Sequence, residues 1–372
     1  MGIDMANLKA QYAAIKDDLD VAVRRVFETC RFVLGESVQN LEEEVARHSG
    51  ARFGVSVASG TDAILIALKA IGVGPGHEVI TTPFTFVATT EAIVLAGATP
   101  VYADIDLDSF NIDPSDVERR ITPRTRAIVP VHLYGRCADM DAIGRIAKRH
   151  GVAVVADAAQ AIGAEENGRR VGEMGDAVTL SFFPTKNLGA YGDGGMILTN
   201  DEAVAEKATS LRFHGMVPGS YHYRDIGYCS RLDELQAAVL LVKLRRLESW
   251  NDRRRRNAKS YISALSGTSV VTPSLPADGK HTFHQFTIRH PNRDALRSKL
   301  QEKGVASMIY YPLPLHLQPA YTALGYGEGS FPKSELAASE VLSLPVHPEL
   351  TDDEVAFVAE AVAQSAAEAS EA

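Results

Sequence analysis

Cysteine, basic charge and long apolar runs are all scarce in this chain of 372 residues. The 3 cysteines, Cys30, Cys137 and Cys229, are odd in number and scattered, which excludes a disulfide framework and a cysteine-rich zinc site. Lysine and arginine total 38 against 47 aspartates and glutamates, and the formal net charge of −9 disfavours a nucleic-acid-binding protein. No apolar run approaches the length of a membrane span, and the first residues lack a signal-peptide pattern. We therefore expect a cytoplasmic protein with no metal, nucleic-acid or membrane partner.

Hydrophobic residues make up 45% of the chain, and their spacing follows two different periods. Apolar residues recur every three or four positions in residues 8–26, 36–48 and 139–150, as is typical of amphipathic helices. Continuous apolar runs from residue 78 onward indicate strands that are buried on both faces. This alternation predicts an α/β fold in which helices sandwich a mostly parallel sheet. The expected strands span residues 78–82, 99–104, 126–132, 152–157, 177–182 and 195–199.

The last third of the chain has the pattern of a second, smaller unit. We expect one long helix that is capped by Ser230 and whose apolar stripe reaches Trp250. A boundary near this helix would divide a large domain of residues 1–249 from a small C-terminal domain of residues 250–372.

The small domain is expected to be α+β. The arginine run of residues 253–256 is predicted to lie on a solvated helix face, and the tail of residues 365–372 is predicted to be frayed. The expected elements are a strand at residues 282–289, a helix at residues 292–303 and a final helix that begins at the capping box of Thr351 and Glu354.

One lysine lies where an apolar strand meets a glycine-rich turn. The segment of residues 177–195 reads AVTLSFFPTKNLGAYGDGG, and Lys186 follows Pro184, which stiffens the turn. Lysine favours solvent, so a lysine closed in by small residues is placed for chemistry. Its amine can form a Schiff base with an aldehyde. A lysine in an ordinary surface loop would explain this segment equally well.

An aspartate ends the apolar run GVAVVADAAQ of residues 151–160. Ligands of open α/β sheets bind beyond the carboxyl ends of the strands, where Asp157 would lie. A buried carboxylate is costly unless it is paired with a cation, and the protonated pyridine nitrogen of pyridoxal phosphate would be such a partner. Alternatively, Asp157 caps a helix that follows the strand.

Residues 55–68 predict a strand, a tight turn and a buried helix that ends near Gly72. The backbone N–H groups and the dipole at the start of such a helix attract phosphate. Gly60 allows close approach of the backbone, and Thr61 adds a hydroxyl group. An ordinary helix cap would look similar, but a phosphate turn beside Lys186 and Asp157 predicts a pyridoxal-phosphate site.

These segments resemble the DegT/DnrJ/EryC1/StrS family of sugar aminotransferases. The resemblance covers nearly the whole chain in the family's order, and its most specific parts are the Lys186 segment and residues 157–160. It implies the aspartate-aminotransferase fold (fold type I), pyridoxal 5′-phosphate as cofactor and a homodimer with active sites at the interface. The other matching stretches are residues 59–63, 83–89, 130–135, 230–238 and 311–316.

The resemblance also implies roles for individual residues. Lys186 would carry the cofactor and later transfer the proton, and Asp157 would pair with the pyridinium nitrogen. Gln160 would donate a hydrogen bond to the cofactor's ring oxygen.

Four more residues would hold the cofactor according to the resemblance. Gly60, Thr61 and Ser181 would bind the phosphate, and Phe86 would stack on the pyridine ring. Without the resemblance, the apolar neighbours of Phe86 would favour a place in the core.

The substrate side is expected to include one arginine and one aromatic segment. Arg231 is the better candidate for a nucleotide diphosphate and Arg224 the second, although a solvated arginine at a helix start would look the same. In this family, the segment that carries Tyr310, Tyr311 and His316 approaches the substrate. Aromatic packing in a proline-rich turn is the alternative.

Position 229 departs from the family. The family has an asparagine there that typically reaches the cofactor phosphate of the neighbouring subunit, whereas this chain has Cys229. Because cysteine is a poor hydrogen-bond donor, we do not expect Cys229 to make this contact.

The resemblance implies transfer of an amino group from glutamate to a nucleotide-linked keto sugar. The Lys186 segment and the His214-Gly215 pair are more similar to the branch that makes 3-amino uronic acids, which favours a 3-oxo over a 4-oxo sugar. A keto-cyclitol such as an inosose is the alternative substrate, and a non-catalytic regulator that retains the fold is the alternative class. Related dehydratases have histidine in place of Lys186, which argues against that activity.

Overall fold

The centre of the protein is a mixed, mostly parallel sheet, as the sequence predicts. The computed structural model describes residues 2–217 and 219–370. Within them, seven strands form this sheet: β1 (Phe53–Val57), β2 (Glu78–Thr81), β3 (Thr99–Tyr102), β4 (Thr125–Ile128), β5 (Ala153–Asp157), β8 (Ala177–Ser181) and β9 (Gly195–Thr199). Their order is β1-β9-β8-β5-β4-β2-β3. Only β9 runs antiparallel to its neighbours.

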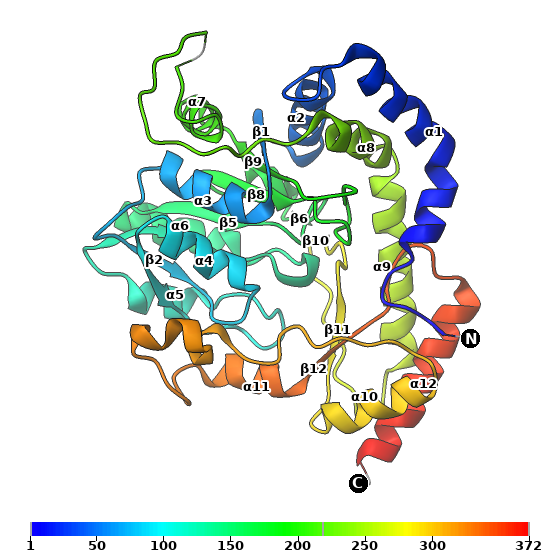
Figure 1. Cartoon of the computed structure of the whole chain (residues 1–372). Helices are drawn as coiled ribbons and strands as arrows, with labels where there is room; N and C mark the ends of the chain where they lie inside the picture. Colours follow the sequence, from blue (N-terminus) through cyan, green and yellow to red (C-terminus); the bar gives the residue numbers. More distant parts are fainter. Residues whose placement is uncertain (1, 218, 371–372) are drawn as a thin grey trace.

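Helices cover both faces of this sheet (Figure 1). Side chains alternate along each strand, so Val154 and Ala156 of β5 face one group of helices and Val155 faces the other. One face is covered by α3 (Gly60–Ala70), α4 (Val87–Leu95) and α7 (Glu202–Arg212), and the other by α2 (Glu36–Ser49), α5 (Pro114–Arg120), α6 (Met140–His150) and α8 (Glu234–Leu244). Helix α1 (Leu8–Thr29) packs on α8.

The prediction of one long helix capped by Ser230 was wrong. The stretch forms two helices, α8 and α9 (Leu247–Ala264), and α8 begins only after Asp233. The Ser230 hydroxyl is engaged elsewhere, because it donates to Asp62 Oδ2 at 2.6 Å and accepts from the Ala58 N–H at 3.1 Å. Helix α8 packs on the sheet, while α9 runs toward the C-terminal part of the chain (Figure 1).

The C-terminal part has its own α+β core. Tyr261, Phe286, Leu342 and Val358 belong to a buried cluster that is separate from the clusters of the large sheet. Residue 249 lies inside α9, and the division into domains at this point stays a prediction. The elements here are antiparallel β11 (Phe286–Arg289) and β12 (Val341–Leu344), α10 (Arg293–Glu302), α11 (Pro332–Glu340) and α12 (Asp352–Ser370).

Short elements complete the chain. Among the described residues, no helix is long and apolar enough to cross a membrane. The short strand β6 (Glu165–Glu166) pairs with both β7 (Arg169–Arg170) and β10 (Gly279–Lys280). The 3₁₀ turns are η1 (Leu133–Gly135), η2 (Val171–Glu173), η3 (Leu315–Leu317) and η4 (Pro319–Leu324).

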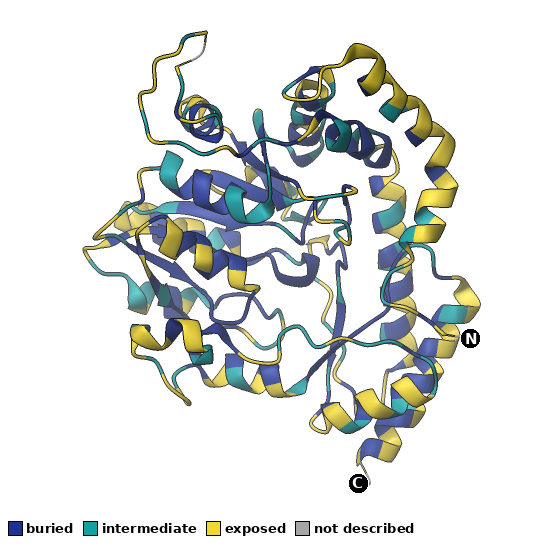
Figure 2. Ribbon diagram, viewed as in Figure 1, coloured by how far each residue is buried: buried dark blue, intermediate teal, exposed yellow. Residues whose placement is uncertain are grey.

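Two surface predictions for the C-terminal part were wrong. Arg254 does not lie on a solvated face: it is buried, and its Nη1 donates to the Phe283 carbonyl at 3.1 Å. The tail is helical up to Ser370, because Ala366 and Ala369 are buried in the C-terminal core (Figure 2). Residues 371–372 lie outside the described part.

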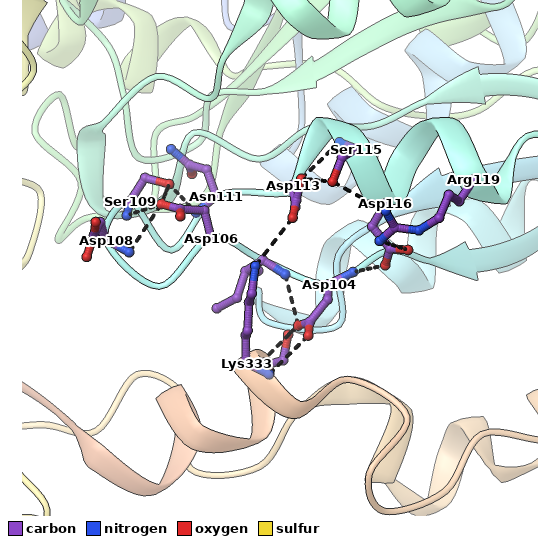
Figure 3. A network of polar contacts seen from close by, with 12 residues as sticks. Asp104, Asp106, Asp108, Ser109, Asn111, Asp113, Ser115, Asp116, Arg119 and Lys333 are labelled. Carbon is purple, nitrogen blue, oxygen red and sulfur yellow. Dashed lines mark hydrogen bonds and ion pairs between the residues drawn. The ribbon is translucent and has the colours of Figure 1, made fainter.

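A group of carboxylates joins the loop after β3 to α11 (Figure 3). Asp104 accepts from the N–H groups of Lys333 at 3.0 Å and Ser334 at 2.9 Å, which belong to the first turn of α11. Asp113 caps α5 by accepting from the Ser115 N–H at 2.9 Å. First-turn N–H groups have no partner inside a helix, so these carboxylates satisfy them. The network holds α11 against the large sheet.

Candidate active site

The carboxyl ends of three strands meet at one edge of the sheet. Strands β1 and β8 both pair antiparallel with β9 and therefore point the same way, and β5 is parallel to β8. The register places both Val57 and Ser181 opposite Gly195. The turn after β1, Asp157 at the end of β5 and Ser181 at the end of β8 are thus brought to the edge where ligands of such sheets bind.

The turn of residues 59–61, called here the phosphate turn, begins α3 and includes backbone N–H groups that donate no hydrogen bond within the described residues. The Ser59 hydroxyl accepts from the Asp62 N–H at 3.1 Å. The N–H groups of Gly60 and Thr61 have no acceptor among residues 2–217 and 219–370. A Cβ at Gly60 would lie 2.7 Å from Ser181 Cβ, so only glycine lets the turn approach Ser181 this closely. The three residues predicted to bind phosphate are therefore adjacent.

The turn between β8 and β9 holds Lys186. The Lys186 N–H donates to the Phe183 carbonyl at 2.8 Å, and a Cβ at Gly189 would lie 2.3 Å from the Pro184 carbonyl oxygen, so the turn closes tightly. The side chain of Lys186 is partly buried. Burial lowers its pKa to about 8, and the negative charge of Asp157 opposes this shift. A lysine in an exposed surface loop would keep its usual pKa.

Asp157 is a buried carboxylate with two protein donors. Thr89 Oγ1 donates to its Oδ2 at 2.7 Å, and the Ala159 N–H donates to its Oδ1 at 3.1 Å. Burial raises the pKa of Asp157, while these hydrogen bonds and the charge of Lys186 oppose the shift. The alternative role of Asp157 as a helix cap was wrong, because the chain turns after β5 without starting a helix.

Gln160 links the site to two tyrosines. Its Oε1 accepts from the Tyr134 N–H at 2.7 Å, and its Nε2 donates to the Tyr311 hydroxyl at 3.2 Å. The Tyr311 ring centre lies 6.2 Å from that of Phe86. Phe86 is 55% exposed, so the alternative that it packs in the core was wrong. Tyr310 takes part through its carbonyl, which accepts from the Tyr134 hydroxyl.

The other residues predicted to contact substrate have very different surroundings. Arg231 is partly exposed, its Nη2 donates to Cys229 Sγ at 3.0 Å, and its guanidinium carbon lies 5.0 Å from the Phe213 ring centre. The His316 side chain is 0% exposed, and its Nε2 lies 3.0 Å from Glu335 Oε1. His316 thus has no surface to offer a substrate, and the structure does not bring its ring into the site.

Sequence reasoning missed three residues that complete the site. Thr89 orients Asp157, Ser230 binds Asp62 in the first turn of α3, and His284 lies with its Nδ1 3.3 Å from Asn187 Oδ1. The only signal in the sequence was a polar side chain within an apolar stretch. That signal does not show which polar group the side chain will meet.

Pyridoxal phosphate requires an amine for its aldehyde, an anion for its ring nitrogen and N–H groups for its phosphate. This sheet edge supplies each from a different strand, and the absence of room for a Cβ at Gly60 fits a phosphate held against the backbone. Together with the order of the strands, this chemistry defines a pyridoxal-phosphate-dependent transferase of fold type I.

Comparison with known proteins identifies the family. Residues 13–363 match the DegT/DnrJ/EryC1/StrS aminotransferase family, and the chain belongs to it. It is 54% identical, over 98% of each chain, to a pleiotropic regulatory protein of Geobacillus stearothermophilus. It is 45% identical, over 96% of each chain, to the UDP-N-acetyl-3-dehydro-alpha-D-glucosamine 3-aminotransferase of Acidithiobacillus ferrooxidans.

A solved structure supports the same family assignment. The crystal structure of Streptomyces venezuelae DesV in complex with a ketimine intermediate matches this fold with a TM-score of 0.96, at 43% identity over 98% of each chain. The chain is therefore a pyridoxal-phosphate-dependent sugar aminotransferase.

Proposed function

We propose that this enzyme transfers an amino group from glutamate to a nucleotide-linked keto sugar, with a 3-oxo sugar favoured over a 4-oxo sugar. The observation that carries the aminotransferase chemistry is Lys186, with its lowered pKa, in the same site as the buried Asp157. The relative from Acidithiobacillus ferrooxidans is named as a 3-aminotransferase of a UDP-linked sugar, which supports the preference for a 3-oxo substrate.

Lys186 is the proton carrier in this proposal. The bound cofactor supplies an electron sink that stabilises negative charge on the α-carbon of the amino donor. With a pKa of about 8, about one tenth of Lys186 is the free amine at pH 7, which is far more than at its usual pKa and which a general base requires. Its Nζ would take the proton from the donor's α-carbon and return it at the cofactor's C4′ carbon. In the second half of the reaction the same atom would move a proton in the reverse direction, with the keto sugar as acceptor.

The other residues would hold the reacting groups still. Asp157 would balance the charge on the ring nitrogen, and Gln160 would hydrogen-bond the ring oxygen. Gly60, Thr61 and Ser181 would bind the phosphate through N–H and hydroxyl groups. The exposed ring of Phe86 would cover one face of the pyridine ring and exclude water from it.

The nucleotide would bind on the Arg231 side of the site. A diphosphate requires cationic or N–H donors, and among the described residues only Cys229 Sγ accepts a hydrogen bond from the Arg231 guanidinium. The remaining donors of that side chain are open to a ligand. We place Tyr310 and Tyr311 beside the sugar, since Tyr311 contacts Gln160.

We also propose a homodimer with active sites at the interface. The family resemblance carries this proposal, and large exposed apolar side chains support it: Phe27 is 55%, Tyr221 91% and Ile226 97% exposed. Residues 213–217 and 219–229, between α7 and α8, extend away from the sheet (Figure 1). Cys229 would not supply the cross-subunit contact of the family's asparagine.

A panel of keto substrates tests the proposal. UDP- and dTDP-linked 3-oxo and 4-oxo sugars and an inosose would be supplied with glutamate, and glutamate consumption would be measured. We expect the fastest turnover with a 3-oxo nucleotide sugar, and none from the Lys186→Arg variant, which keeps the charge but cannot join the cofactor. Turnover of the inosose alone would show that the substrate is a keto-cyclitol and not a nucleotide-linked sugar. No turnover on any member, together with no retained cofactor, would favour a regulator.

A further inference from the structure

Lys243 is a fully buried lysine that the proposed mechanism does not use. It lies in the last turn of α8 and is 0% exposed. Burial of an ammonium group is costly unless nearby groups compensate its charge. In residues 2–217 and 219–370 no carboxylate pairs with its Nζ, which contacts the turn between β8 and β9 instead. The groups that compensate this charge thus belong to the turn that carries Lys186.

The contacts of Lys243 are to a backbone carbonyl and an aromatic ring. Its Nζ donates to the Gly189 carbonyl at 2.5 Å and lies 4.5 Å from the ring centre of Tyr191. No other group of the described residues donates to that carbonyl. Burial lowers the pKa of Lys243 to about 8, and the charge of Glu349 opposes the shift, so the ammonium form predominates at pH 7. Both contacts are strongest with a charged amine.

The backbone of Gly189 packs directly on the part of the turn that precedes Lys186. The Lys186 N–H donates to the Phe183 carbonyl at 2.8 Å. A Cβ at Gly189 would lie 2.9 Å from the same carbonyl oxygen and 2.3 Å from that of Pro184. Movement of the Gly189 carbonyl would therefore move the backbone that holds Lys186.

A second side chain of α8 holds the same turn. Gln236 Oε1 accepts from the Tyr191 N–H at 2.8 Å. Gln236 and Lys243 are two helical turns apart, so both side chains project from one face of α8. The helix thus supports the turn at Gly189 and at Tyr191.

We propose that Lys243 is a positioning residue for Lys186: its ammonium group holds the Gly189 carbonyl in place, so that the turn presents the Lys186 amine to the aldehyde of the cofactor. The inference rests on the proposed role of Lys186. Joining forms a C=N bond between Nζ of Lys186 and the aldehyde carbon and releases the aldehyde oxygen as water. The rate of this step depends on how the amine is placed against that carbon, so a displaced turn would lower it.

Lys243→Met tests this role, because it removes the donor and the charge but keeps a side chain of similar length. The buried Gly189 carbonyl would lose its partner, and the turn would move to find another donor. We expect joining to slow about tenfold or more, since the lost hydrogen bond involves a charged group. The complex that forms before joining should keep its affinity, because the phosphate turn and Asp157 would hold the cofactor there without the amine.

Stopped-flow absorbance after mixing pyridoxal phosphate with the cofactor-free full-length chain at pH 7 separates the two quantities. The dependence of the observed rate on cofactor concentration gives the affinity of the first complex and the rate of joining. Reduction with borohydride and mass spectrometry would confirm Lys186 as the joined residue. Lys69→Met is the control and should change neither quantity, because Lys69 also lies in the last turn of a helix, α3, and donates to a backbone carbonyl, that of Ala96 at 3.4 Å.

Lys243→Gln is the second variant and decides the question if Lys243→Met does not fold. It keeps an N–H donor in a smaller side chain but loses the charge, which supplies about half the strength of such a hydrogen bond, so joining should slow about threefold.

Three outcomes would overturn the proposal. An unchanged rate of joining would show that Lys243 does not position Lys186, and equal losses of rate and affinity would show a general loosening of the fold. A chain that folds with neither substitution would show that Lys243 serves the core. Failure of the proposed function would appear separately, as an unsubstituted chain in which the cofactor never joins Lys186.

Discussion

At the scale of single residues, Asp157 is fixed before any ligand binds. Its two oxygens accept from Thr89 and from the Ala159 N–H, so the carboxylate cannot rotate without losing a buried hydrogen bond. Burial favours the protonated form, and these donors favour the carboxylate. The ring nitrogen of the cofactor would therefore meet an anion that is already oriented.

Thr89 provides a direct test of this orientation. We expect Thr89→Val to weaken binding of pyridoxal phosphate by about tenfold to a hundredfold, because a hydrogen bond to a charged group contributes about 1.5–3 kcal/mol. Thr90→Val is a matched control, since Thr90 is also buried but its hydroxyl lies 3.3 Å from the Tyr102 hydroxyl. Affinity would be measured by titrating the cofactor into cofactor-free protein. Equal losses in both variants would contradict the role of Thr89.

The lowered pKa of Lys186 predicts a pH profile. Burial lowers this pKa from 10.5 to about 8, so the amine form, which attacks an aldehyde, accumulates as the pH rises through about 8. The rate at which cofactor-free protein captures pyridoxal phosphate should rise up to this pH and level off above about 9. Asp157→Asn removes a charge that raises the pKa, so its midpoint should be lower. A midpoint near 10.5 would show that burial has no such effect.

At the scale of elements, the phosphate turn depends on the convergence of two strands. The start of α3 can approach an anion because β1 and β8 end side by side, with Ser181 directly against Gly60. The helix alone would offer the same N–H groups but no hydroxyl beside them.

Gly60→Ala tests this close approach. The added Cβ would lie 2.7 Å from Ser181 Cβ, and overpacking of this kind costs about 1–3 kcal/mol, so cofactor affinity should fall about fivefold to 150-fold. Gly74→Ala is the control, because a Cβ there would meet nothing within 4 Å. Cofactor titration and thermal unfolding would be measured for both variants. If Gly60→Ala binds the cofactor normally, the turn is not the phosphate site.

The break between α8 and α9 also has a local function. Gln236 on α8 accepts from the Tyr191 N–H at 2.8 Å, and Lys243 Nζ donates to the Gly189 carbonyl at 2.5 Å. Both contacts hold the turn that carries Lys186. A single straight helix would follow α9 away from the sheet, whereas the break keeps α8 in contact with this turn.

At the scale of the whole molecule, the proposed homodimer accounts for apolar side chains that a monomer would leave in water. We expect the chain to sediment as a dimer, and Phe27→Glu and Ile226→Glu to raise the dimer dissociation constant about tenfold or more, with loss of activity. Leu336→Glu is the control, because Leu336 is exposed on α11. A fully active monomer would contradict the proposal.

Much of the fold was predictable because its signals are local. The strand predicted at residues 195–199 is β9, and the helix predicted at residues 36–48 is α2, which ends at Gly50. Both depend on apolar spacing and on glycine at a chain reversal, which neighbouring residues determine. The start of α8 after Asp233 was not predictable, because the hydroxyl of Ser230 donates to Asp62, a residue distant in the sequence, and does not cap the helix.

The residues of the candidate site also divide into those that short motifs predict and those that they do not. Lys186, Asp157 and residues 59–61 were predicted from short motifs, because each motif places its own residues at the end of a strand, and Ser181 was predicted from the family resemblance. Phe86 and His316 were ambiguous, since an aromatic residue in an apolar run can lie inside or outside. The structure leaves Phe86 exposed and encloses His316 against Glu335.

The sequence by itself therefore determined the class of fold and the cofactor, and it predicted the lysine that would carry the cofactor, because periodicity and short motifs are properties of consecutive residues. The tertiary structure decided which polar side chains meet: Thr89 with Asp157, Ser230 with Asp62, and His284 with Asn187. Such pairs join distant parts of the chain. They form because a buried polar group must find a partner, and only the packed fold determines which partner is within reach.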